Sequence, residues 1–101
     1  MSKATMIGSL TCQEGKEEET EAVLAKMVAA SANEPGVEIY SYHKGEDCKF
    51  WFFAIMTSAD SMQVHGQTDA MKEAMEEFMP LLAGQPEMSM ATPVAAYGMD
   101  I

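Results

Sequence analysis

The chain has 101 residues, nearly half of them apolar, which predicts one globular domain over residues 1–101 and excludes a disordered chain. Six lysines, no arginine and a net charge of −10 exclude a nucleic-acid partner, because phosphate binding depends on basic side chains. The lack of arginine also favours a neutral, apolar or aromatic ligand over a phosphate. No apolar run reaches the roughly 20 residues of a membrane span and no leader is recognisable, so we expect a cytoplasmic protein without a membrane partner.

The first part of the chain predicts a strand, a long helix and a second strand. Residues 5–12 are short and rich in β-forming side chains, and a polar turn containing glycine follows them. From residue 16 to 33 the apolar positions recur every three or four residues, which is typical of one helical face. A Pro-Gly pair at 35–36 ends this helix, and residues 37–44 are expected to form the next strand.

A hairpin with an aromatic second strand comes next. A polar turn of four residues leads to a predicted strand at 49–57, which is apolar on both faces. If the hairpin is centred on this turn, Tyr42 lies beside Trp51 across the two strands. Tyr40 then lies beside Phe53 on the same face. A strand that is apolar on both sides must be covered on both, so we expect helices on one face and a second subunit on the other.

The remaining sequence predicts two helices and a closing strand. Residues 58–65 begin with a helix-start signal and form a short helix. Thr68 is the expected cap of the second helix, which carries a long apolar stripe. Pro80 should kink or end that helix, because proline cannot donate to the carbonyl four residues before it. Residues 88–97 have the length of a last strand, and Pro93 restricts it to a sheet edge or a bulge.

The predicted order of elements is β-α-β-β-α-β, which is typical of the ferredoxin-like α+β fold. In this fold a four-stranded antiparallel sheet carries its helices on one face. The other face of the predicted sheet also has apolar side chains. We therefore expect a homodimer in which two sheets pack against each other.

Three segments are informative when they are placed in this fold. They are the Glu34-Pro35-Gly36 break followed by Tyr40, the strand at 50–56, and the segment at 58–65 that ends in a histidine. Together they resemble the antibiotic biosynthesis monooxygenase (ABM) family of dimeric α+β barrel proteins, and residues 71–78 follow as that family's second main helix. The resemblance covers the whole chain in element order and length, and it implies a homodimeric, ferredoxin-like subunit.

The resemblance also implies an activity. Family members include monooxygenases that oxidise phenols or quinols with dioxygen and no cofactor, and oxygenases that degrade haem. The haem-degrading members use an asparagine, a tryptophan and a histidine ligand where this chain has Gly8, His65 and Met75. Because all three differ, the resemblance favours a cofactor-independent monooxygenase for a small aromatic hydroxy compound. Met56 and Ala54 replace a tryptophan and an acidic residue of many relatives, which predicts a more apolar pocket.

His65 is the candidate catalytic residue, since imidazole titrates near neutral pH and can accept a phenolic proton. The sequence shows no carboxylate partner for it, so a structural histidine at a helix junction is the competing interpretation. In the family the ligand cleft lies between sheet and helices. The substrate-binding residues implied by that placement are Phe50, Phe52, Met71, Met75 and Phe78. The aromatic residues Tyr40, Tyr42, Trp51 and Phe53 are expected to pack mainly against the partner subunit.

Two residue types leave the function open. Cys12 and Cys48 fit no disulfide framework and no metal-ligand spacing, so we expect free thiols and no metal site. The eleven methionines can fill a core or line a pliable apolar pocket. Two other functions compete with the monooxygenase: a non-enzymatic, apolar-ligand-binding or stress-related member of the same dimeric barrel group, and a purely structural dimerisation module. An open cleft that reaches His65 beside a polar partner would favour the enzyme.

Overall fold

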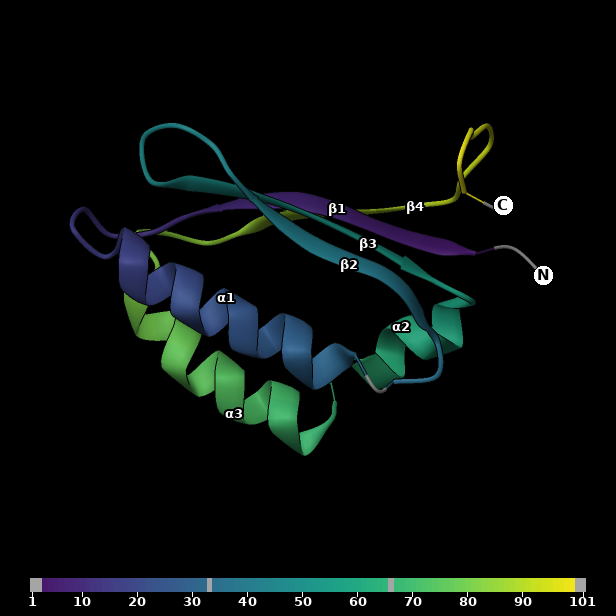
Figure 1. Cartoon of the computed structure of the whole chain (residues 1–101), viewed down its shortest axis with the longest axis horizontal. Helices are drawn as coiled ribbons and strands as arrows, with labels where there is room; N and C mark the ends of the chain where they lie inside the picture. Colours follow the sequence, from purple (N-terminus) through teal and green to yellow (C-terminus); the bar gives the residue numbers. More distant parts are fainter. Residues whose placement is uncertain (1–2, 33, 66, 100–101) are drawn as a thin grey trace.

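The computed structural model describes residues 3–32, 34–65 and 67–99, and it has the predicted α+β architecture. Helices α1, α2 and α3 lie on one face of a four-stranded antiparallel sheet, whose strand order is β2-β3-β1-β4 (Figure 1). The elements are β1 (Ala4–Thr11), α1 (Glu17–Ser31), β2 (Val37–Lys44), β3 (Lys49–Met56), α2 (Ala59–His65), α3 (Asp69–Phe78), a short 3₁₀ helix (Met79–Leu81) and β4 (Glu87–Ala91). The ferredoxin-like order is thus confirmed.

Local signals explain where the helices begin and end. The hydroxyl of Thr68 accepts a hydrogen bond from the backbone N–H of Met71 at 3.2 Å, so Thr68 caps α3 as predicted. Helix α3 ends at Phe78, two residues before Pro80, and the chain continues as a 3₁₀ helix that accommodates the proline. Helix α1 has three glutamates in its first turn, where carboxylates complement the positive end of the helix dipole.

The closing strand is shorter than predicted. Strand β4 ends at Ala91 rather than continuing to residue 97, because Pro93 cannot donate to a strand ladder. It pairs with β1 alone, and therefore lies at the edge of the sheet as the proline suggested.

The register of the β2–β3 hairpin differs from the expectation by one residue. Tyr42 lies opposite Phe52 and not beside Trp51. Because side chains alternate between the faces of a strand, this shift places Tyr40 and Tyr42 on the face that the helices cover. Trp51 lies on the other face. The prediction that the two tyrosines share a face with Trp51 and Phe53, and pack against a partner subunit, is wrong.

The turn between these strands causes the shift. The backbone N–H of Gly45 donates to the carbonyl of Lys49 at 2.8 Å, which leaves a loop of three residues instead of four. Asp47 and Cys48 both have positive φ angles, of 56° and 63°, and this left-handed pair closes the loop. Neither residue is a glycine, so the usual sequence signal for such a turn is missing.

The outer face of the sheet, opposite the helices, is partly apolar. Ile7 on β1 is 45% exposed and Trp51 on β3 is 49% exposed. Ile39 on β2 is 38% exposed and lies on the same face, because it pairs with Ile55, which shares a face of β3 with Trp51 although Ile55 itself is buried. None of the helices in the described part of the chain has the length and apolar character of a membrane-spanning segment.

Candidate functional site

A cavity of about 550 Å³ lies between the sheet and the helices. Strands β1, β2, β3 and β4 and helices α1, α2 and α3 all contribute side chains to its wall. Most of these side chains are apolar, and six of the eleven methionines are among them: Met6, Met27, Met71, Met75, Met88 and Met90. Many methionines therefore line a space instead of filling it, and their unbranched side chains can adapt to a ligand.

The structure brings most of the predicted site residues together around this cavity. His65 lines the cavity, and so do Phe52, Met71, Met75 and Phe78. Phe50 lies elsewhere. It is buried in the core and borders a separate hollow of about 510 Å³ between α1 and β2.

His65 is buried at the end of α2 and has a carboxylate partner. Its Nδ1 atom lies 2.9 Å from Oε2 of Glu34 and 3.3 Å from the hydroxyl oxygen of Ser31. The Ser31 hydroxyl is 3.0 Å from the carbonyl of Met27, to which it donates. An ionised carboxylate can only accept hydrogen bonds, so in the neutral imidazole the proton resides on Nδ1. The Nε2 lone pair is then free, and Nε2 has no hydrogen bond to any residue that the structure describes.

The loop after α1 and the start of α2 hold this pair in place. Glu34 lies at the α1–β2 junction, where Gly36 accepts a backbone hydrogen bond from Thr57 at 2.9 Å. The side chain of Ser61, in the first turn of α2, occupies the space in which a Cβ atom of Gly36 would lie. The glycine thus allows α2, which ends at His65, to approach the junction that carries Glu34 closely.

Glu34 is the site residue that the sequence analysis missed. It lies 31 residues from His65, and no spacing rule connects the two positions. Its other oxygen, Oε1, is buried and has no hydrogen-bond partner among the described residues. Within that part of the chain, the contact with His65 is the only side-chain hydrogen bond of this carboxylate, and a buried polar atom without a partner requires an explanation. The only signal in the sequence was its place directly before the Pro-Gly break.

Two tyrosines adjoin His65 in the cavity wall. The ring of Tyr40 meets the imidazole edge-on, with 4.8 Å between the ring centroids and an angle of 90°. The hydroxyl oxygens of Tyr40 and Tyr42 are 2.6 Å apart, and the ring of Tyr42 packs against the ring of Phe52. Burial raises the pKa of both phenols above the ordinary value, so both are neutral at physiological pH.

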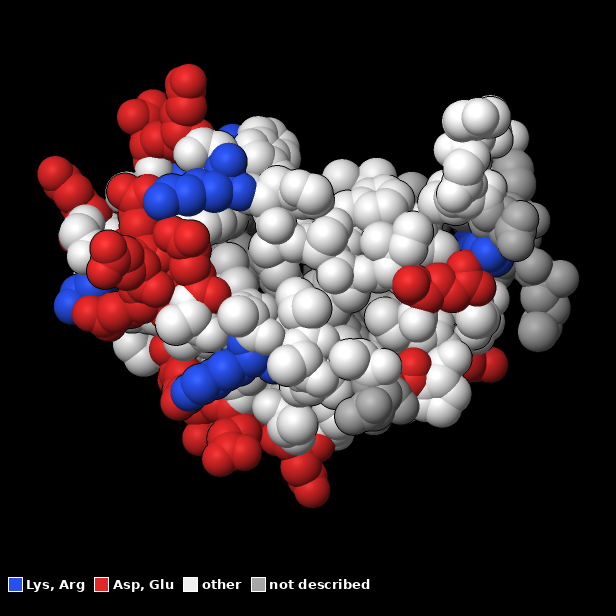
Figure 2. All heavy atoms as spheres, viewed as in Figure 1, with Lys and Arg blue, Asp and Glu red and all other residues white. Residues whose placement is uncertain are grey.

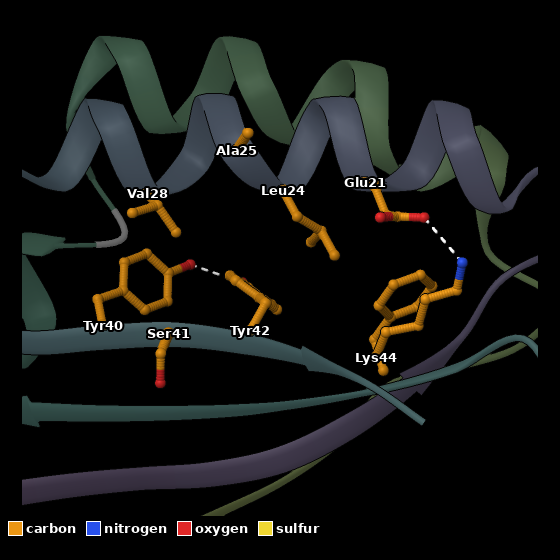
Figure 3. A pocket seen from close by; sticks show the side chains of 9 residues that line it. Glu21, Leu24, Ala25, Val28, Tyr40, Ser41, Tyr42 and Lys44 are labelled. Atoms are coloured by element: carbon orange, nitrogen blue, oxygen red, sulfur yellow. Dashed lines mark hydrogen bonds and ion pairs between the residues drawn. The ribbon is translucent and has the colours of Figure 1, made fainter. Parts of the chain in front are cut away.

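Figure 3 shows the second hollow, which lies on the other side of the two tyrosines. Both rings extend from β2 toward α1, while Ser41 between them points away. An ion pair of 3.0 Å between Lys44 and Glu21 spans one end of the hollow, so this end has no free charge for a ligand. Tyr40 and Tyr42 line both spaces and form the partition between them.

Other features limit the chemistry of the molecule. A side chain at Gly8 would collide with the carbonyl of Glu87 and the ring of Phe52, so any larger residue at position 8 would force these neighbours to shift. Partial burial, together with the nearby carboxylate of Glu17, raises the pKa of the Cys48 thiol to about 11. This thiol is protonated at neutral pH and is a poor nucleophile. The described residues contain no group of three or more histidine, cysteine or acidic side chains placed to hold a metal ion.

Comparisons with known proteins agree with this fold. The sequence model of a family described as antibiotic biosynthesis monooxygenase matches residues 4–77, which include the His65–Glu34 pair. A proposed antibiotic biosynthesis monooxygenase from Caulobacter crescentus is 27% identical, with a TM-score of 0.88 over 93% of this chain and 92% of its own. Two further proteins that are also described as proposed antibiotic biosynthesis monooxygenases, from Chloroflexus aurantiacus and Nitrosomonas europaea, are similar to this chain in fold. The first is 20% identical, with a TM-score of 0.84 over 98% of this chain and 100% of its own. The second is 12% identical, with a TM-score of 0.88 over 96% and 95%. No curated protein matches the sequence.

Proposed function

Because the chain belongs to the antibiotic biosynthesis monooxygenase family, we propose that it is a monooxygenase that oxidises a small aromatic hydroxy compound with dioxygen and without a cofactor. The observation that carries this proposal is the buried His65–Glu34 pair in the wall of an apolar cavity. A base held in one tautomer by a carboxylate is suited to removing a proton from a substrate hydroxyl.

The proposed reaction begins with proton transfer from the aromatic hydroxyl to Nε2 of His65. The carboxylate of Glu34 stabilises the imidazolium that results. The phenolate is rich in electrons and reduces dioxygen directly. One oxygen atom forms a carbonyl at a ring carbon and the other leaves as water, so that a phenol and one dioxygen give a quinone and one water. The protein supplies the base and the orientation of the substrate.

The cavity suits a neutral aromatic molecule. Its volume is within the range of small-molecule sites, and its wall consists mainly of methionine and aromatic side chains. Figure 2 shows that the acidic side chains gather at the end of the molecule where α1 begins, while the centre of this face carries almost no charge. The centre of this face therefore offers no cluster of charge that would bind an ionic ligand.

We also propose that the protein is a cytoplasmic homodimer. Ile7 and Trp51 expose apolar surface on the outer face of the sheet, and a second copy could bury both. Two free thiols, Cys12 and Cys48, are compatible with a reducing compartment.

Oxygen consumption with a panel of quinols and anthrones tests the catalytic role of His65. We expect turnover of at least one compound by the wild type and a decrease of about 10²–10⁴-fold in the His65→Ala variant, the usual contribution of a positioned base. Lys72→Ala is the control, because Lys72 is exposed on α3 and lines neither the cavity nor the outer face of the sheet. A fully active His65→Ala variant would refute this assignment. Ligand binding without oxygen consumption by the wild type would instead support the non-enzymatic function.

A further inference from the structure

The polar side chains of the cavity are few, and three of them form one cluster. The polar residues of the wall are Tyr40, Tyr42, Gln63, His65 and Gln85. Both glutamines are exposed to solvent, whereas the other three are buried or partly buried. Among the side chains that line the cavity, a ligand can therefore form buried hydrogen bonds only with His65 and the two tyrosines.

The hydrogen bond between the tyrosines leaves one proton for a ligand. Each phenol has one O–H donor, and the 2.6 Å contact between the two oxygens uses one of the two protons. Neither hydroxyl has any other hydrogen bond to the residues that the structure describes. The other O–H group of the pair is thus available to a ligand. The hydrogen bond between the two tyrosines polarises this O–H group and makes it a stronger donor.

The tyrosine pair and the candidate base line the same cavity and are in contact. The ring of Tyr40 touches the imidazole of His65, so the tyrosine pair and the imidazole belong to the same corner of the cavity. A substrate hydroxyl that gives its proton to Nε2 becomes negatively charged at its oxygen. A neutral O–H donor that is already held in place stabilises such a charge with little reorganisation.

We propose that the Tyr40–Tyr42 pair binds the substrate oxygen from which His65 removes the proton, and that it stabilises the resulting phenolate. This role rests on the proposed function for the class of ligand, an aromatic hydroxy compound. One tyrosine donates to the substrate oxygen, while the other donates to the first tyrosine and keeps it oriented. The alternative role of the pair is purely structural, as the partition between the two hollows.

Absorbance titration of bound p-nitrophenol tests the proposal, because the phenolate of this probe absorbs visible light and the measurement needs no turnover. We expect the wild type to lower the pKa of the bound probe relative to the free probe. Each of the variants Tyr40→Phe and Tyr42→Phe should raise that pKa by about one unit, a tenfold change in ionisation, for one lost hydrogen bond. The double variant should resemble the single ones, since the two hydroxyls act as a unit.

Tyr97→Phe is the matched control, because Tyr97 is fully exposed and is not among the residues that line the cavity. Circular dichroism of each variant checks that the fold is retained. Probe pKa values that are unchanged in both cavity variants would overturn the proposal, and so would a wild type that does not bind the probe. The proposed function can fail separately. If the wild type lowers the pKa of the probe but consumes no oxygen with any substrate, the monooxygenase activity is refuted, whereas the role of the tyrosine pair in binding a phenolate oxygen is supported.

Discussion

The carboxylate of Glu34 determines which nitrogen of His65 keeps a free lone pair, and this lone pair is the proposed base. In Glu34→Gln the amide can donate to Nδ1, which would move the imidazole proton to Nε2 and block it. We expect kcat to decrease by roughly 10²-fold or more, while the affinity for a substrate analogue changes little, because Glu34 does not line the cavity.

Steady-state kinetics and a binding titration on the same preparation measure these two quantities. Glu76→Gln is a suitable control, because Glu76 is an exposed carboxylate on α3 without an ion pair in the described part of the chain. Equal kcat values for Glu34→Gln and the wild type would show that Glu34 is only a structural partner of His65.

At the scale of elements, the approach of α2 to the α1–β2 junction depends on Gly36. A methyl group in Gly36→Ala would collide with the side chain of Ser61, so α2 and His65 must shift. We expect a loss of about 1–3 kcal/mol in the free energy of unfolding, which is typical of overpacking, and a decrease in activity.

Urea denaturation measures the effect on stability. Gly84→Ala is the control, since a Cβ atom there meets no neighbouring atom within 4 Å. Adding Ser61→Gly to Gly36→Ala removes the collision and should restore part of the activity, despite the cost of a glycine in a helix. If Gly36→Ala is as stable and active as the control variant, close packing at this junction does not position the site.

The β2–β3 hairpin shows how a small local feature changes the interpretation of a whole element. A loop of three residues in place of four moves the side chains of β2 from Ile39 to Lys44 to the opposite face, up to an irregularity between Val37 and Ile39. Tyr40 and Tyr42 change in this way from expected contacts with a partner subunit into residues of the cavity wall. The left-handed conformations of Asp47 and Cys48 determine the loop length. Neither residue is a glycine, so the sequence does not predict these conformations.

At the scale of the whole molecule, the outer face of the sheet predicts self-association. Sedimentation at micromolar concentration should give the mass of a dimer for the wild type. A charge in Trp51→Glu should produce a monomer, because a buried unpaired carboxylate in the interface is costly. Met79→Glu is the control, since Met79 is 50% exposed, as Trp51 is at 49%, but lies in the 3₁₀ helix after α3. A monomeric wild type would contradict the proposed dimer.

The sequence by itself determined the order and type of the elements and the ferredoxin-like fold, because helical periodicity, helix caps and the Pro-Gly break act within a few residues. The resemblance carried by the sequence also pointed to His65, Phe52 and Phe78 and to two of the six methionines that line the cavity, Met71 and Met75. Only the tertiary structure decided that Glu34 pairs with His65, because residues 31 apart meet only when the chain folds. It also decided the face of Tyr40 and Tyr42, because the register of a hairpin depends on backbone angles in its turn.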